Sequence, residues 1–243
     1  MKLLKPVSIL QLTGVWVLDK SLSDDMDPLV KLQSLSWILR QVLKHITITF
    51  TITESATTTP ATKDSTPSSS LQVDILHTAT GGITGTTEKR ILDWKPHVHH
   101  DHVYKTLTVR SRLISGETDS DGRVRPAVQL HGAYRDGERV CEFLRGKVSA
   151  DGKEDDGFLV EEPGCVLFEN VAALGCWVHT VSCSEALGWV MEQTWGFEMI
   201  DGERYHTRRV VVADNHGDFA LGRAVCKWQG PVGGTGDFDG HVA

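Results

Sequence analysis

The sequence lacks long apolar runs and has no excess of basic residues. No window approaches the roughly 20 consecutive apolar residues that a membrane-spanning helix requires. The apolar stretch near the start is interrupted by Pro6 and is too short for the core of a signal peptide. The formal net charge of −7 disfavours nucleic acid and anionic membranes, which both bind basic surfaces. We therefore expect neither membrane insertion nor a nucleic-acid partner.

Cysteine is also scarce, and the few cysteines are not arranged in C-x-x-C pairs. The chain has five of them: Cys141, Cys165, Cys176, Cys183 and Cys226. An odd number of unpaired thiols is typical of a reducing compartment, so we predict a cytoplasmic protein without disulfides. The sequence also contains no G-x-S-x-G elbow, no H-E-x-x-H motif and no phosphate-binding loop.

Tryptophan, by contrast, is abundant, with seven Trp against three Tyr. Such bulky side chains line pockets as well as cores. A chain of 243 residues, 40% of them hydrophobic, is long enough to bury a sizeable core. We predict one domain over residues 1–229, with a mobile polar loop at 55–70 and a disordered Gly-rich tail at 230–243.

The segment 13–40 organises the rest of the chain. It begins as a strand at Gly14 and Trp16, continues through an acidic stretch, and then places leucines at helical spacing. Asp24, Asp25 and Asp27 suit the positive end of a helix dipole. The spacing predicts one amphipathic helical segment that extends from about Leu29 to Leu43.

The remainder of the sequence has the pattern of antiparallel strands. Apolar residues alternate with threonines over 46–53, which is typical of a strand with one buried face. Further strands are predicted over 71–80, 86–94 and 102–113. Turn signals at Gly116 and at the Asp-Gly pairs 121–122, 136–137 and 151–152 predict more short strands. We therefore predict an all-β fold, a single antiparallel β-barrel with a short helical lid after its first strand.

The Asp201-Gly202 pair predicts a hairpin register. A two-residue turn makes Ile200 and Glu203 partners. Counting outward then places one set of side chains on the inner face of the sheet: Met191, Gln193, Trp195, Phe197, His206, Arg208, Val210 and Val212. The opposite set, with Glu192, Glu198 and Arg209, is expected to form a solvated outer surface.

Residues Gly14 to Leu18, followed by Ser21, Asp24-Asp25, Met26 and the helical segment 32–40, resemble the opening of fatty-acid-binding proteins. In that family the first strand leads into a helix–turn–helix that covers a β-barrel. The wider calycin superfamily, which includes the lipocalins, shares the Gly-x-Trp start and a late-strand Arg near that Trp. The segments TGGITGTTEKRILDW, HHDHVY and RSR look like an uncharacterised group of fungal calycin-like proteins. This resemblance implies a role in secondary metabolism, where some such proteins act as cofactor-free cyclases or isomerases.

The first candidate site is a histidine cluster of His97, His99, His100, Asp101 and His102. Alternation along one strand separates its members onto two faces, and a metal needs three or four converging ligands. Three interpretations stay open: a solvated histidine cluster, a metal site, or an acid–base pair formed by His102 and Asp101. We predict no metal.

The second candidate site is the inner face of the hairpin, with Gln193, His206 and Arg208. An Arg in an apolar interior must meet a partner or an anionic or carbonyl ligand. Arg208 is therefore either a ligand anchor that stabilises oxyanion charge or a structural group stacked on Trp16.

The third candidate is a set of four charged residues on neighbouring strands, which we interpret as an exposed ion-pair ladder: Glu88, Arg90, Arg110 and Arg112.

These observations lead to a functional hypothesis. The barrel binds a hydrophobic small molecule, polyketide- or terpenoid-like, and catalyses its cyclisation or isomerisation without a cofactor. The alternative is a non-catalytic carrier of a fatty acid or another lipophilic ligand. The predicted ligand-binding residues are Trp16, Trp94, Tyr104, Met191, Trp195 and Phe197, and the predicted catalytic residues are Asp101, His102, Gln193, His206 and Arg208. A monomer or a homodimer is expected.

Overall fold

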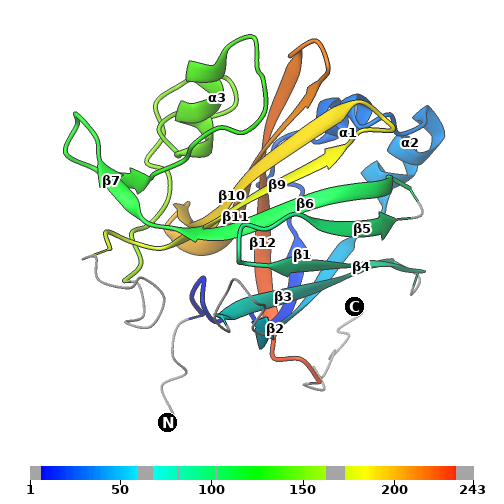
Figure 1. Ribbon diagram of the computed structural model, residues 1–243, viewed down its shortest axis with the longest axis horizontal. Helices are drawn as coiled ribbons and strands as arrows, with labels where there is room; N and C mark the ends of the chain where they lie inside the picture. Colours follow the sequence, from blue (N-terminus) through cyan, green and yellow to red (C-terminus); the bar gives the residue numbers. More distant parts are fainter. Residues whose placement is uncertain (1–6, 60–67, 81–82, 102, 163–172, 234–243) are drawn as a thin grey trace, which may run out of the picture.

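The computed structural model describes residues 7–59, 68–80, 83–101, 103–162 and 173–233. Ten strands form one antiparallel sheet in the order β4-β3-β2-β1-β12-β11-β10-β9-β6-β5 (Figure 1). Their bounds are β1 Gly14–Leu18, β2 Ile48–Thr59, β3 Ser68–Ala79, β4 Ile83–Ile91, β5 His97–Asp101, β6 Lys105–Ile114, β9 Trp177–Ser184, β10 Trp189–Ile200, β11 Glu203–Asp214 and β12 Phe219–Gly230. The predicted mostly-β antiparallel architecture is confirmed.

The sheet curls so that its two ends approach each other. Arg90 on β4 donates a hydrogen bond to Ser182 on β9, 3.2 Å away, although six strands separate these two in the pairing order. The backbone N–H of Trp94, after β4, donates to Ser111 O on β6 at 2.8 Å. In the described ladder β4 and β5 are the edge strands. Full closure of a barrel therefore stays a prediction.

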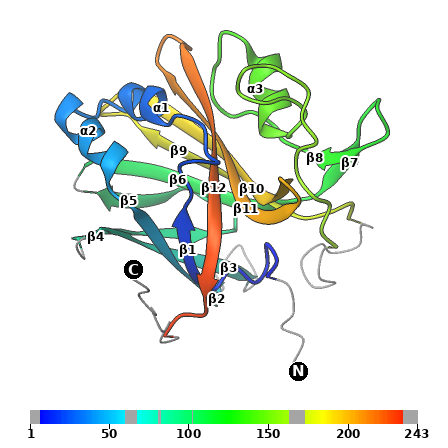
Figure 2. The same ribbon diagram turned by 180° about the vertical axis from the view of Figure 1, so that it is seen from behind.

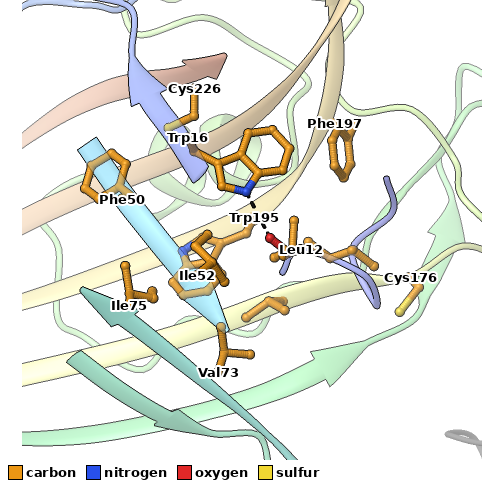
Figure 3. Packing of buried hydrophobic residues seen from close by; sticks show 12 residues of the cluster. Leu12, Trp16, Phe50, Ile52, Val73, Ile75, Cys176, Trp195, Phe197 and Cys226 are labelled. Carbon is orange, nitrogen blue, oxygen red and sulfur yellow. Dashed lines mark hydrogen bonds between the residues drawn. The ribbon is translucent and has the colours of Figure 1, made fainter. Parts of the chain in front are cut away.

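A cluster of apolar side chains fills one end of the curled sheet (Figure 3). Trp16, Ile52 and Trp195 are fully buried there, together with Leu12 from the segment that precedes β1. The Trp16 indole Nε1–H donates to Leu12 O at 2.9 Å, shown as the dashed line in Figure 3. This bond satisfies the one polar atom of a buried Trp and fixes the chain entry across this end of the sheet.

Two short helices cover the other end, α1 Asp27–Leu32 and α2 Trp37–His45 (Figure 2). The sequence predicted one segment, but Ser34 between them has a left-handed backbone conformation with φ 66°, which ends the first helix. Leu29 of α1 is buried, while α2 has no buried residue. The Lys20 ammonium donates to Leu43 O and Ile46 O, carbonyls at the end of α2. The helix–turn–helix that the family resemblance implied is thus present, and α1 is the part of it that packs on the sheet.

An insertion packs against the outer face of β9, β10 and β11. It contains a small hairpin, β7 Gly116–Thr118 with β8 Val124–Pro126, and a third helix, α3 Gly137–Leu144 (Figures 1 and 2). Phe143 and Val140 of α3 pack with Trp177 and Val211 of the sheet. The prediction of short strands is confirmed around Asp121-Gly122, where β7 pairs with β8, and is wrong at Asp136-Gly137. The Asp-Gly pair at 136–137 begins a helix instead, because Asp136 accepts a hydrogen bond from Arg139 N as an N-cap.

The insertion also explains why the predicted solvated outer surface was wrong. Glu192, Glu198 and Arg209 are completely or almost completely buried beneath it. Arg209 donates from Nε to Glu198 at 2.7 Å, from Nη2 to Asp155 at 2.9 Å, and from Nη1 to Val148 O at 2.7 Å. A guanidinium with this many acceptors ties the insertion to the sheet.

The Asp201-Gly202 register is confirmed for every predicted pair, including Phe197 with His206 and Trp195 with Arg208. Both turn residues have positive φ, 51° and 82°, which is the geometry of a two-residue hairpin turn. The predicted polar loop is shorter than expected, because β2 continues to Thr59 and β3 begins at Ser68. Residues 60–67 and 234–243 lie outside the described residues.

Candidate functional site

The β10–β11 hairpin supplies the polar groups of the inner face. Gln193 and Trp195 on β10 lie opposite Val210 and Arg208 on β11. The Trp195 indole N–H donates to Gln193 Oε1 at 2.8 Å, and Gln193 Nε2 donates to Met191 Sδ at 3.2 Å. Both ends of the Gln193 amide therefore have partners within the hairpin, and Gln193 orients the Trp195 ring.

Arg208 is the cation of this inner face. Only 7% of the residue is exposed, and its guanidinium carbon lies 4.2 Å from the centre of the Trp195 ring and 5.2 Å from that of Phe50. Burial lowers the pKa of Arg208, yet an Arg starts so far above neutrality that it stays charged. Its Nη2 is buried without a hydrogen-bond partner among the described residues. Arg208 stacks on Trp195 rather than on Trp16, which differs from the structural alternative that the sequence left open.

His206 positions Arg208. Its Nδ1 lies 3.0 Å from Gly196 O, a carbonyl that only accepts, so Nδ1 carries the proton and Nε2 accepts from Arg208 Nε at 3.4 Å. Burial and then the adjacent Arg208 cation lower the pKa of His206 to about 3. The neutral imidazole of His206 has both nitrogens engaged and positions Arg208. A catalytic role of His206 itself stays a prediction.

Four further residues face Arg208 across the interior. With it they form what we call the inner polar cluster: His77, Glu88, Arg90, Ser182 and Arg208. Glu88 pairs with Ile75, and Arg90 with Val73, so both side chains share the face of the buried core. Arg90 Nη2 donates to Glu88 Oε2 at 2.7 Å. The interpretation of Glu88 and Arg90 as an exposed ladder was wrong, because Arg90 is 3% exposed and points inward.

Glu88 is the hub of the inner polar cluster. His77 Nε2 lies 3.3 Å from Glu88 Oε1, at an angle outside hydrogen-bond geometry. Burial alone raises the pKa of Glu88, but Arg90, then His77 and Arg208, hold it well below its usual range. The side chains of Glu88 and His77 keep 28% and 31% of their surface exposed although they face inward. Solvent therefore reaches part of both side chains. Alternation of strand 71–80 identifies inward positions, but no sequence signal joined His77 to Glu88.

The lid contacts the same interior. Gln33 of α1 is 6% exposed; its Nε2 lies 3.6 Å from Met191 Sδ and its Oε1 accepts from Tyr104 OH at 3.4 Å. The Tyr104 ring meets the edge of Trp189 at 5.6 Å. Tyr104 and Met191, both predicted ligand-binding residues, therefore lie beneath the lid.

Trp16 and Phe197 lie at the packed end. Trp16 is 2% and Phe197 1% exposed, and both rings surround the imidazole of His206. In Figure 3 Trp16 lies between Phe50 and Phe197, and Trp16 and Phe50 are direct partners on β1 and β2. Trp16 and Phe197 belong to the apolar cluster that fills this end of the interior.

Trp94 packs against outer-face residues, and its ligand-binding role stays a prediction. It lies in the β4–β5 connection, where its ring stacks on His179 of β9 with the ring centres 5.4 Å apart. The guanidinium of Arg112, on β6, lies 4.1 Å from the centre of the Trp94 ring. His179 is on the outer face, where its Nε2 lies 3.0 Å from Glu192 Oε2. Glu192 Oε1 accepts from His131 N, Gly132 N and Tyr134 OH. This set anchors the insertion.

The histidine cluster is dispersed. His97 Nε2 lies 2.9 Å from Asp93, His100 Nδ1 lies 3.2 Å from Thr106 Oγ1, and His99 pairs with Leu107 on the inner face. His102 and the side chain of Asp101 lie outside the described residues, so their role stays a prediction. Among the described residues, no three His, Cys, Asp or Glu side chains gather in a way that could hold a metal ion.

Two surface hollows lie away from the inner polar cluster. The larger, about 340 Å³, is bordered by Leu18, Lys20, Lys44 and Lys227. The smaller, about 160 Å³, lies on the outer face beside Arg110 and Cys183. Neither is lined by a predicted catalytic residue. Within the described residues no helix has the length and apolar content to cross a membrane.

The curled antiparallel sheet with a helical lid after its first strand is the class of structure that segment 13–40 resembles. Solved structures to which the chain is similar include the Schistosoma mansoni fatty acid binding protein in complex with arachidonic acid, at 15% identity over 89% of this chain and 95% of that chain, with a TM-score of 0.35. Another is the fatty-acid-binding protein of Manduca sexta, at 13% identity over 89% and 98%, with a TM-score of 0.38.

Among curated proteins, the chain is similar to the pericyclase pydY of an Acremonium species. The two are 24% identical over 219 residues, which cover 90% of this chain and 92% of the relative. No family model matches the chain.

Proposed function

We propose that this protein binds a hydrophobic, polyketide- or terpenoid-like small molecule inside the curled sheet and catalyses its cofactor-independent cyclisation or isomerisation. The observation that carries the proposal is Arg208. Its guanidinium is buried, stacked on Trp195, and has an Nη2 group to which no described residue offers a hydrogen-bond acceptor. An unpaired buried cation is costly, so a folded chain retains it where a ligand completes its bonding.

The chemistry follows from this geometry. A carbonyl oxygen of the ligand accepts a hydrogen bond from Arg208 Nη2, and its hydrocarbon packs against Trp195 and Phe50. The hydrogen bond strengthens as negative charge grows on that oxygen in the transition state, which lowers the barrier. The apolar walls hold the chain of the ligand folded with its reacting carbons close together. The similarity to a pericyclase over most of both chains supports a ring closure of this kind.

A carrier is the second candidate. A buried cation among aromatic rings would equally bind the carboxylate of a fatty acid. The Schistosoma mansoni protein described above was solved in complex with arachidonic acid. A carrier returns its ligand unchanged, whereas cyclisation or isomerisation gives a product of the same molecular mass and a different retention time.

The test uses extract from a strain of the source organism that lacks the gene. Purified protein is incubated with this extract, and the mixture is resolved by liquid chromatography and mass spectrometry. We expect one compound to be replaced by an isomer of identical mass. Arg208→Gln should slow this replacement at least tenfold, as expected when one oxyanion-stabilising donor is lost.

Arg204→Gln is the matched control. Arg204 is on the same strand and the same face, but it stacks on Phe197 near the packed end and pairs with Glu161. Its substitution should leave turnover unchanged. Retention of an extract compound by the protein without any isomer formed would instead identify a carrier.

A further inference from the structure

The least expected feature of the interior is an acid–base pair that faces the free cation. His77 on β3 lies 3.3 Å from Glu88 on β4, and Glu88 is itself held by Arg90 at 2.7 Å. We infer that His77 is a general acid–base residue and that the substrate is an enolisable carbonyl compound whose oxygen binds Arg208. This inference rests on the proposed function and deepens it. A ring closure alone needs no proton transfer, so an acid–base residue indicates a proton-transfer step in addition to it.

The geometry of His77 suits this role. Its Nε2 is buried against Glu88, while 31% of the side chain is exposed, so the exposed part of the ring lies on its other atoms. The edge of the ring also contacts Phe50, with centroids 5.0 Å apart at 88°. The negative charge of Glu88, 3.3 Å from Nε2, favours the proton on that nitrogen without a hydrogen bond, and this leaves Nδ1 as a base.

Arg90 and Ser182 hold the Glu88 carboxylate beside His77. Arg90 donates from Nη2 to Glu88 Oε2 and from Nη1 to Ser182 Oγ at 3.2 Å, across the gap between β4 and β9. Arg90 and Glu88 are therefore positioning residues. The Arg208 cation also helps to lower the pKa of Glu88.

The step conserves atoms and electrons. The substrate in this step has a C–H carbon between its carbonyl and a carbon–carbon double bond. His77 Nδ1 takes the proton from that carbon, the C–H electron pair forms a new carbon–carbon double bond to the carbonyl carbon, and the carbonyl π pair moves to oxygen, where Arg208 Nη2 stabilises the dienolate. The imidazolium beside Glu88 then returns the proton to the far carbon of the original double bond, the oxygen pair re-forms the carbonyl, and the double bond shifts into conjugation with it. The net change is an isomerisation to a conjugated enone, an oxadiene suited to ring closure, with the molecular formula unchanged.

The strands around His77 supply the following charged and uncharged groups. Glu88, which lies against His77, and its partner Arg90 come from β4, and the Arg208 cation of β11 acts on Glu88. On β2 the inward neighbour is the uncharged ring of Phe50. Glu54, the inward carboxylate of β2, accepts hydrogen bonds from Leu12 N and Thr13 N at the packed end.

The experiment uses 5-nitrobenzisoxazole, a small apolar probe of proton abstraction from carbon. A base removes its C–H proton, the N–O bond breaks, and a yellow phenolate forms. The intact protein should open this probe with a rate that His77→Gln lowers at least tenfold. His216→Gln, an exposed histidine in the β11–β12 turn, should leave the rate unchanged.

Glu88→Gln supplies a readout that a merely structural role would not move. The carboxylate stabilises the cation that His77 becomes during proton transfer, so Glu88→Gln should lower kcat for the probe at least tenfold and change its KM by less than about twofold. Added imidazole should restore the rate of His77→Ala. An unchanged rate in His77→Gln, or an unchanged kcat in Glu88→Gln, overturns the inference.

Binding is measured in parallel with the dye 1-anilinonaphthalene-8-sulfonate, displaced by the same probe. Displacement of the dye without any dependence of the rate on His77 overturns the acid–base role and leaves the proposed function standing. Failure of both dye and probe to bind removes the proposed function and the inference together.

Discussion

Replacing Arg208 by methionine should leave the protein about as stable as before, whereas the same change at Arg209 should destabilise it strongly. The two residues are adjacent on β11, equally buried, and face opposite sides of the sheet. Arg209 is bonded to Glu198, Asp155 and two backbone carbonyls. Arg208 has one hydrogen bond, to His206, and no ion pair among the described residues.

The magnitudes follow from these contacts. Arg208→Met removes a buried donor without a partner, a gain of about 1–3 kcal/mol. It also loses the stack on Trp195, about 0.5–2 kcal/mol, and one hydrogen bond of about 1 kcal/mol. These effects nearly cancel. Arg209→Met leaves Glu198 buried with Arg223 as its one remaining side-chain partner among the described residues, and breaking such a pair costs about 3 kcal/mol or more.

Urea and thermal unfolding of the two variants at pH 7 measure the difference. For a chain of this size we expect Tm to fall by roughly 6–12 °C in Arg209→Met and to change by only a few degrees in Arg208→Met. A loss of about 3 kcal/mol or more in the free energy of unfolding of Arg208→Met would refute the reasoning, because that is the size expected for a structural ion pair. Arg208 would then be a structural tie like Arg209.

Three further predictions concern other parts of the molecule. The pKa of His206 is about 3 in the folded protein and 6.5 when unfolded, so the unfolded chain takes up the second ring proton first as pH falls. The free energy of unfolding should therefore decline below pH 6.5 by about 1.4 kcal/mol per pH unit, and His206→Gln should flatten this slope in urea titrations. Gln33→Ala removes the contacts of α1 with Tyr104 and Met191, so stopped-flow fluorescence should show faster dye entry and exit with a similar equilibrium affinity; unchanged rates would mean that α1 does not control access. Glu192→Ala removes the buried acceptor of three half-buried donors and should cost about 2–3 kcal/mol while dye binding to the folded protein persists; loss of binding would place the outer face in the site.

Local sequence patterns determined the parts of this fold that depend on neighbouring residues. The Asp201-Gly202 turn fixed the pairing of β10 with β11, and strict alternation then placed Trp195 and Arg208 on one face. The Gly14 and Trp16 strand followed by a helical segment identified the lid. Period and turn chemistry act over a few residues, so these features could be predicted without the fold.

Tertiary structure decided which face is wet. The insertion carrying α3 covers the outside of β9–β11, so Glu192, Glu198 and Arg209, which alternate like surface residues, became a buried polar layer. Trp94, which composition favoured as a pocket residue, was drawn to that outer layer by His179 and Arg112. Nothing within a strand encodes what a segment 60 residues away will cover.

The inner polar cluster was decided in the same way. Glu88 and Arg90 are two residues apart and resemble a surface ion pair in the sequence. They point inward because the β3–β4 register places them opposite buried residues of β3. The curl of the sheet then brings them to Ser182 and Arg208. The sequence alone therefore determined Arg208 as an inward cation, and the tertiary structure added the carboxylate and imidazole that face it. Long-range pairing of strands, rather than local propensity, creates such a juxtaposition.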